Sequence, residues 1–221
     1  MKNVIYLILV SLLVFTSCKK DGSNPISQSE AALTVTYSGK VYHTVKIGKQ
    51  TWLKENLNVG VMIDSMQNHS NNGVIEKYCY GNDTANCNKY GGLYQWNEAM
   101  AYDTIEGAKG ICPDGWHMPT KAEFDTLRAV VNYNGNALKS VGQGMGNGTG
   151  TDSSGFSALL AGSRNYYGIF NLLGSSAFLW SSRGYYAASA YSMYFLYNGS
   201  NIYMNDGYED YGFSIRCIKD E

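Results

Sequence analysis

The chain has 221 residues and carries 17 lysines and arginines against 18 aspartates and glutamates, so its formal net charge is −1. Only 16 % of its residues are charged, where about a quarter is usual, and without a basic patch a nucleic-acid partner is not expected. Its 19 tyrosines and 25 glycines against 3 prolines favour many short strands and loops that present aromatic side chains with a polar end.

The N-terminal residues are typical of an export signal. Lys2 precedes an apolar run from residue 4 to 15, which is too short to cross a bilayer but has the length of a signal-peptide core. Thr16 and Ser17 then lead into Cys18, which resembles a bacterial lipoprotein signal in which the cysteine is cut free and acylated. An ordinary secretory signal is the alternative. We therefore expect a lipid anchor, palmitate included, on Cys18 that holds the protein at the outer membrane, on the cell surface.

Three segments follow from this interpretation. Residues 1–17 are the predicted signal peptide, and residues 18–32, rich in Ser, Gly and other polar residues, are a predicted flexible tether. Residues 33–221 form one predicted domain, because neither a second boundary nor an internal repeat is visible.

The cysteines that remain after Cys18 are even in number, as expected for disulfides in an exported chain. Cys79 and Cys87 bracket a turn-rich stretch that a disulfide could close locally, which leaves Cys112 to pair with Cys217. A zinc site is the competing interpretation, but the chain has no C-x2-C pair and its histidines are scattered. We therefore predict two disulfides and no metal.

The first half of the domain alternates strands, loops and helices. Residues 41–47 and 50–53 form a predicted hairpin around a Gly48-Lys49 turn, and residues 58–76 have no period and are expected to be a loop. Leu93, Trp96 and Met100 have helical spacing and predict a short helix.

A longer helix is predicted after Pro119. Thr120 and Glu123 have the T-x-x-E spacing of a capping box, so the helix should run from about residue 121 to 132. Glycines then alternate through residues 142–150 without the lysine of a phosphate-binding loop, which predicts a flexible surface loop.

The C-terminal half consists of strand-like stretches separated by Gly, Asn and Ser turns. These stretches cover residues 156–165, 177–183, 190–198, 201–206 and 211–220. In the third, the residues from Tyr191 to Tyr197 alternate between two faces. The fold class predicted from these elements is α+β.

One short stretch decides between an enzyme and a binding module. Residues 110–127, "GICPDGWHMPTKAEFDTL", place Cys112 and His117 in a turn before the capped helix. A cysteine nucleophile needs a base within hydrogen-bond reach and a third group that orients the base. The alternative is a structural corner, in which Cys112 is bonded to Cys217.

Several motifs together resemble a known family. "VKIGKQTWLKENLN", "GICPDGWHMPTKAEFDTL" and "YGFSIRCIKD" are similar to the Fibrobacter succinogenes major paralogous domain, over roughly residues 38–220. That family resembles the C-type-lectin-like superfamily, which also holds the formylglycine-generating enzymes. The resemblance implies a single C-type-lectin-like domain with short twisted antiparallel strands, two main helices and long loops.

The same resemblance argues against catalysis. The enzymes of the superfamily need a pair of reactive cysteines near the C-terminus, where this chain has only Cys217. The "EPN" and "WND" triplets with which calcium-dependent lectins hold Ca²⁺ and sugar are also missing, and "YMND" at 203–206 resembles the second only faintly. We therefore expect neither an enzyme nor a cofactor, and Cys112 and His117 to form a structural corner.

The expected function is a surface-anchored, non-enzymatic lipoprotein that binds an unidentified glycan or protein. The late segment carries many tyrosines, and no lysine occurs between Lys139 and Lys219. Tyrosine offers a large contact area at a small entropic cost. A structural role in surface assembly is one alternative, and a ligand-binding protein diversified by a retroelement is another. The residues expected to contact the ligand are Tyr185, Tyr186, Asn201, Tyr203, Asn205, Asp206 and Tyr208.

Short Asp-Ser/Thr-apolar motifs resemble the acceptor sites of O-glycosylation in Bacteroidetes. They predict Thr84 as the best acceptor, with Ser65 and Thr104 as further candidates. A fourth match, at Thr126, falls on the predicted helix and is the least suitable.

Overall fold

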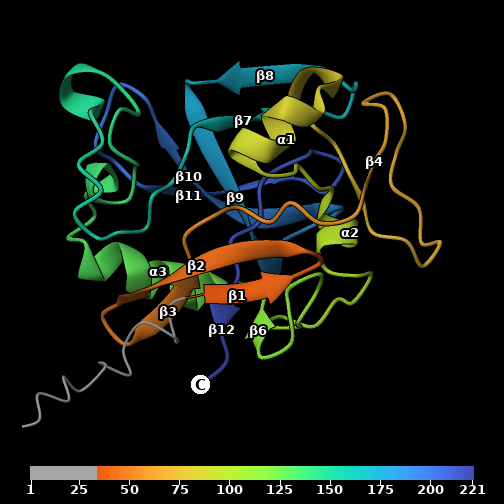
Figure 1. The fold of residues 1–221 in the computed structure, drawn as a ribbon, viewed down its shortest axis with the longest axis horizontal. Coiled ribbons are helices and arrows are strands. Elements are labelled where there is room, and N and C mark those ends of the chain that lie inside the picture. The colour runs from red at the N-terminus through yellow and green to blue at the C-terminus, as the bar shows by residue number, and fades with distance from the viewer. Residues whose placement is uncertain (1–33) are drawn as a thin grey trace, which may run out of the picture.

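The computed structural model describes residues 34–221, which fold into two curled sheets with few helices (Figure 1). The predicted signal peptide (1–17), the lipidation site Cys18 and the tether (18–32) lie outside the described residues. Within residues 34–221, every helix is too short or too polar to span a membrane.

The first sheet is antiparallel, with the strand order β1-β2-β3-β12-β6. The predicted hairpin is present as β2 and β3, and Gly48 adopts a φ of 61° in its turn, a backbone conformation that glycine reaches at little cost. The strands are β1 (Thr34–Tyr37), β2 (Lys40–Ile47), β3 (Gln50–Leu53), β12 (Ile218–Lys219) and β6 (Trp116–His117).

The second sheet has the order β11-β10-β9-β7-β8 and lies beside the first (Figure 1). Its strands pair antiparallel except β7 with β9. Its members are β11 (Tyr203–Tyr208), β10 (Ser189–Leu196), β9 (Ser176–Gly184), β7 (Ala161–Arg164) and β8 (Phe170–Leu173). A parallel pair, β4 (Val61–Met62) and β5 (Glu76–Lys77), adds a third, two-stranded sheet. The stretch 58–76, predicted to be a loop, therefore contains β4 and the first residue of β5.

The second sheet separates two hydrophobic cores, since the side chains of its strands alternate between its faces. Trp180 of β9 packs with Tyr94 and Phe213 in one core, while its neighbour Leu179 packs with Trp52 and other residues in the second. The predicted alternation of β10 is confirmed, because Met193 and Phe195 lie in the second core.

Three α-helices complete the domain: α1 (Thr84–Tyr90), α2 (Trp96–Ala99) and α3 (Lys121–Val130). The capping box predicted at Thr120 is present, with Thr120 Oγ1 accepting from the N–H of Glu123. Helix α3 ends two residues earlier than predicted because Asn132 and Tyr133 adopt left-handed conformations, with φ of 52° and 57°.

The segment after β11 connects the two sheets. The N–H groups of Leu57, Tyr94 and Trp180 donate to the carbonyls of Ile215, Phe213 and Ser214, at 2.9, 2.8 and 3.1 Å. The strand predicted at 211–220 is therefore an extended segment that pairs with several elements in turn, and only β12 is a strand.

Two local predictions are corrected. The stretch between Cys79 and Cys87 contains the start of α1, whose N-terminal N–H of Ala85 is capped by the Asp83 side chain. A seven-residue helix rich in Asn and Thr leaves little hydrophobic periodicity to detect.

The glycine-rich loop at 142–150 is anchored rather than free. The buried ammonium of Lys139 donates to the carbonyl of Gly148 within this loop. It also donates to the carbonyls of Leu196 and Gly199, both at 2.9 Å. The loop is therefore tied to the end of β10, and its glycines allow a close backbone approach.

The predicted disulfides, Cys79–Cys87 and Cys112–Cys217, are both present. They close loops of very different length, with sequence separations of 8 and 105. Loop-closure entropy predicts that the long loop contributes about 4–5 kcal/mol to stability and the short one about 2–3 kcal/mol.

We therefore expect the double variant Cys112→Ala/Cys217→Ala to lose more unfolding free energy than Cys79→Ala/Cys87→Ala. Urea denaturation at one pH measures both. An equal or larger loss for the short-loop variant would show that loop length is not what sets the contribution of these bonds.

Candidate ligand-binding face

The β9–β10 hairpin holds its tip in a strained conformation. Ala187 and Ala188 both have positive φ, 40° and 59°, which L-residues adopt at a cost of about 1 kcal/mol or more each. Hydrogen bonds close the turn: Tyr185 N donates to Ser189 O at 2.8 Å, and Ser189 Oγ donates to Tyr186 O at 2.6 Å. Strained backbone of this kind clusters at functional sites.

A cleft of about 490 Å³ lies beside this hairpin, and we call it the tyrosine cleft. Its size is in the range of small-ligand sites, about 300–1,000 Å³. Tyr186 and Tyr208 are 78 % and 58 % exposed, so their rings are available for contact. The cleft is lined by Tyr185, Tyr186, Ala187, Ser189, Asn205, Asp206, Gly207, Tyr208 and Tyr211.

Five of the seven predicted contact residues line this cleft, and Asn201 and Tyr203 do not. The reason is the register: Tyr208 pairs with Ser189 near the hairpin, whereas Tyr203 pairs with Tyr194 at the other end of β11. Tyr203 instead stacks on Tyr194, with ring centroids 4.8 Å apart, and its hydroxyl accepts from Asn201 at 3.1 Å.

Sequence reasoning missed Tyr166 and Tyr211. Tyr211 lines the cleft, and Tyr166 packs against both Tyr208 and Tyr211, with ring centroids 5.9 and 5.7 Å apart. The signal was present, because Tyr166-Tyr167 repeats the paired-tyrosine pattern of Tyr185-Tyr186. A second hollow of about 330 Å³, lined by Tyr166, Ala188, Tyr208 and Asp210, shares Tyr208 with the cleft.

The charge on this face is negative. Asp206 lines the tyrosine cleft and Asp210 lines the neighbouring hollow, and neither space has a lysine or arginine in its lining. The face therefore suits a neutral, hydroxyl-rich ligand better than an anionic one.

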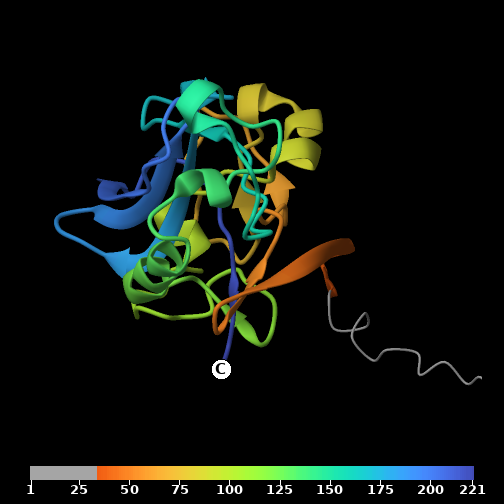
Figure 2. The ribbon, with the colours of Figure 1, turned by 90° about the vertical axis from the view of Figure 1, so that its left-hand side faces the viewer.

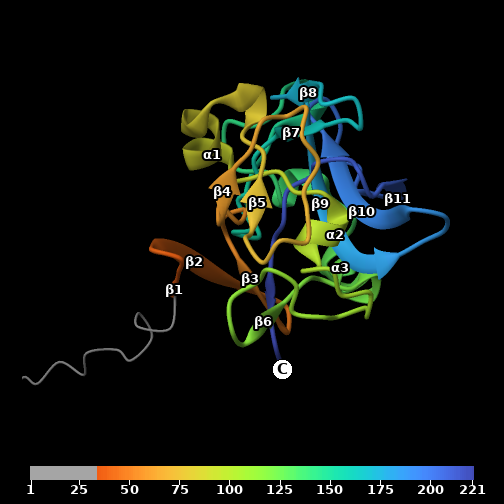
Figure 3. The same cartoon turned by 90° about the vertical axis from the view of Figure 1, so that its right-hand side faces the viewer.

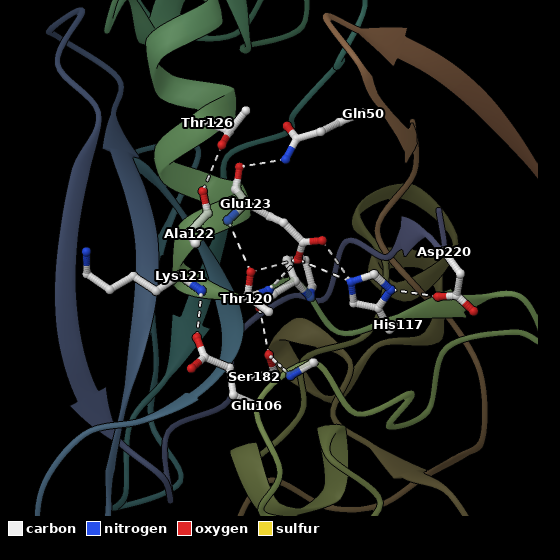
Figure 4. A network of polar contacts seen from close by, with 12 residues as sticks. Gln50, Glu106, His117, Thr120, Lys121, Ala122, Glu123, Thr126, Ser182 and Asp220 are labelled. Carbon is white, nitrogen blue, oxygen red and sulfur yellow. Dashed lines mark hydrogen bonds and ion pairs between the residues drawn. The ribbon is translucent and has the colours of Figure 1, made fainter.

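The pair Cys112 and His117 is not arranged as a nucleophile and base. The sulfur of Cys112 is bonded to Cys217, and both ring nitrogens of His117 contact carboxylates (Figure 4). Nδ1 lies 2.7 Å from Asp220, and Nε2 lies 3.0 Å from Glu123. This network ties the start of α3 to the end of β12, as expected of a structural corner.

Protonation strengthens that corner. The hydrogen bond to Glu123, followed by the one to Asp220, raises the pKa of His117 despite its partial burial. Burial alone would raise the pKa of Glu123, but the hydrogen bonds from His117 and Thr120 lower it overall. A charged imidazolium between carboxylates is the form that these contacts favour.

The predicted acceptors of O-glycosylation lie in different environments. Thr84 is exposed and is the first residue of α1, not part of a loop, and Thr104 is exposed. Ser65 is 6 % exposed, and its carbonyl accepts from the Arg164 guanidinium at 2.6 Å. On the folded domain the burial of Ser65 leaves Thr84 and Thr104 as the accessible candidates.

Comparison with known proteins supplies a family. The chain matches the model of the Fibrobacter succinogenes major domain over residues 45–219. No curated protein and no solved structure matches it. The matched range begins within β2 and ends in β12, so it includes the whole second sheet, β3, β6 and β12 of the first sheet, and the tyrosine cleft. His117 and Glu123 lie inside it, whereas β1 and Asp220 lie outside it.

The pKa of His117 predicts how the stability of the corner depends on pH. This pKa is raised above its ordinary 6.5. The stability that protonated His117 contributes to the folded domain is therefore complete below about pH 6.5, and it is lost as the pH rises through the raised pKa. The pKa of Glu123 is lowered, so the stability that its carboxylate contributes is complete above its ordinary pKa of 4.5. That stability is lost as the pH falls through the lowered pKa.

The difference in unfolding free energy between the parent protein and His117→Gln should therefore be largest at about pH 5–6 and shrink towards about pH 8. Asp220→Asn should weaken this pH dependence without abolishing it. Urea denaturation across the pH series is the measurement, and a difference that stays constant from pH 5 to pH 8 would contradict the assignment.

Proposed function

The chain belongs to the Fibrobacter succinogenes major domain family, and we propose that it is a non-enzymatic binding protein that holds a neutral glycan in the tyrosine cleft. The observation that carries the proposal is the cleft itself, in which exposed tyrosine rings stand beside the amide of Asn205 and the carboxylate of Asp206. Aromatic faces pack against the apolar faces of sugar rings, and the neighbouring polar groups accept and donate hydrogen bonds.

Tyr208 is central to this proposal because it lines both hollows of the face. Its ring is held edge-on by Tyr211 and Tyr166, with centroids 5.7 and 5.9 Å away. Tyr211 in turn contacts Phe213 of the buried core, at 5.8 Å. A ring ordered in advance loses little entropy on binding, which favours affinity.

We further propose that the domain is C-type-lectin-like. In support, Gly115, Trp116, Pro119 and Thr120 form a corner that opens a capped helix, and a terminal Gly212–Arg216 segment closes the domain. Both features resemble motifs of the formylglycine-generating enzymes. The bonded sulfurs of Cys112 and Cys217 support a non-enzymatic role.

The proposed location is the outer membrane, with a lipid on Cys18 and the domain facing outwards. The sequence of residues 4–18 is the main support for the anchor. The two disulfides add support, because such bonds persist in compartments outside the cytoplasm.

A second candidate function is assembly on the cell surface, favoured by the position of β11 at the edge of its sheet, where β10 is its one strand neighbour within residues 34–221. An edge strand can add a strand from another chain through its main-chain groups. Assembly of this kind would give an oligomer that depends on protein concentration, whereas glycan binding does not require one.

The test is binding of the domain to maltotetraose, cellotetraose, xylotetraose and mannotetraose by calorimetry. For whichever of these binds, Tyr186→Ala and Tyr208→Ala should each weaken affinity by about 2 kcal/mol, the loss typical of a central tyrosine, without unfolding the domain.

Tyr203→Ala is the matched control, because Tyr203 lies on the same strand as Tyr208 but outside the cleft. It should leave affinity unchanged. If all three variants weaken the affinity for a glycan equally, or if none of them weakens it, the cleft is not the site of that glycan. If none of the four glycans binds and the protein forms oligomers, assembly is the better account.

A further inference from the structure

A cavity of about 510 Å³ opens between the start of β2, the segment after β3 and the C-terminal half of α1. Figure 3 places α1 and β2 on the opposite side of the molecule from β10 and β11, so this cavity is separate from the tyrosine cleft. Figure 2 shows the same separation, with the β9–β10 hairpin projecting away from α1.

The lining of this cavity is cationic. It includes Lys40, Lys54, Lys89 and Arg216 but only one carboxylate, that of Glu55, and we call it the lysine cavity. In the described part of the chain none of the three lysines forms an ion pair. The cations therefore outnumber the carboxylate, and the unpaired lysine side chains remain available to a ligand.

The single carboxylate is already engaged. Glu55 Oε1 lies 2.7 Å from Nδ1 of His43, and Glu55 Oε2 accepts from the backbone N–H of His43, also at 2.7 Å. Both oxygens of Glu55 thus point at His43, whose exposed ring does not line the cavity. Glu55 does not pair with any of the lysines.

Arg216 adds a buried charge at the same wall. Its side chain is 1 % exposed, and its guanidinium donates to the Asn56 side chain and to the carbonyls of Leu53 and Phe156. All of these acceptors are neutral. They use four of the five guanidinium N–H groups, so one N–H of Nη2 has no acceptor within residues 34–221. Glu55 and Asp152 act on Arg216 through charge, but within residues 34–221 no carboxylate accepts a hydrogen bond from its guanidinium. Burying a cation without a directly bonded anion is costly, and an anion in the cavity would offset that cost.

The remaining lining groups suit a sugar. Tyr90 presents a half-buried ring, with the Lys89 ammonium 4.9 Å from its centroid, and Asn88 is an exposed amide. Ser140 also lines the cavity. The volume is larger than an inorganic ion needs and is in the range of about 300–1,000 Å³ found for small-molecule sites.

We propose that the lysine cavity binds an anionic saccharide, a sugar that carries a carboxylate or a sulfate. Lys40, Lys54 and Lys89 bind the anionic group, and Arg216 supplies a fixed positive field behind it. Asn88, Ser140 and Tyr90 are placed to contact the hydroxyls and the ring of the sugar. This site is independent of the neutral ligand proposed for the tyrosine cleft, and the two sites differ in charge.

The test uses four matched probes in NMR titrations of the folded domain at low salt: galacturonate, galactose 6-sulfate, galactose and sodium sulfate. We expect one or both anionic sugars to bind at least about tenfold more tightly than galactose and than sodium sulfate. Their relative affinities distinguish a carboxylate site from a sulfate site. Binding should weaken strongly in 0.5 M NaCl, because exposed charges are screened.

Variants locate the site. Lys54→Gln/Lys89→Gln should weaken binding of the anionic sugar by at least about tenfold, whereas Lys54→Arg/Lys89→Arg keeps the charges and should retain most of it. Lys46→Gln, on the same strand as Lys40 but outside the cavity lining, and Tyr208→Ala, in the tyrosine cleft, should leave it unchanged. Thermal unfolding checks that each variant is folded.

Four results would overturn the proposal. Galactose that binds as well as the anionic sugars would show that charge is not recognised. Sodium sulfate that binds as tightly as either anionic sugar would show an adventitious ion only. An affinity for anionic sugars that is unchanged in Lys54→Gln/Lys89→Gln, or no binding of either anionic sugar, would show that this cavity is not a saccharide site.

Discussion

The segment from Gly212 to Lys219 is the constraint on which the rest of the domain depends. Gly212 and Ser214 pair with Arg164 and Trp180, whereas Phe213, Ile215 and Cys217 accept from Tyr94, Leu57 and Leu53. The two five-stranded sheets share no strand, so this segment is the main-chain connection between them. The segment is far along the chain from the residues with which it pairs. The entropic cost of closing these long loops is therefore offset only when the whole domain folds.

Both proposed sites are attached to this segment. Tyr211, just before it, lines the tyrosine cleft and contacts Phe213 in the core. Arg216, within it, lines the lysine cavity. Because neighbouring residues of an extended chain point to opposite sides, a single buried segment can support sites on two faces. The acidic cleft and the cationic cavity can then bind unlike ligands without competing for space.

The sequence was most informative where the cause of structure is local. The capping box at Thr120 and the turn at Gly48 determine α3 and the β2–β3 hairpin through contacts between near neighbours, and both were predicted. After Cys18 the sequence has four cysteines, and two of them are close together in the chain. This pattern predicted both of the disulfides that are present. The tyrosine cleft was predicted only in part, because the strand register that separates Tyr203 from Tyr208 is set by tertiary pairing. The lysine cavity left no local signal, since its cations are contributed by β2, the segment after β3, α1 and the C-terminal segment.

The most direct test of the central role of the C-terminal segment is hydrogen exchange of the amides that donate to it. The N–H groups of Leu57, Tyr94 and Trp180 lie in different elements but share this acceptor segment. If the segment joins the domain into one cooperative unit, all three should exchange with the same free energy, equal to that of global unfolding measured by urea. Exchange of Trp180 and Leu57 through separate, smaller openings would show that the two sheets are stable without it, and would contradict this account.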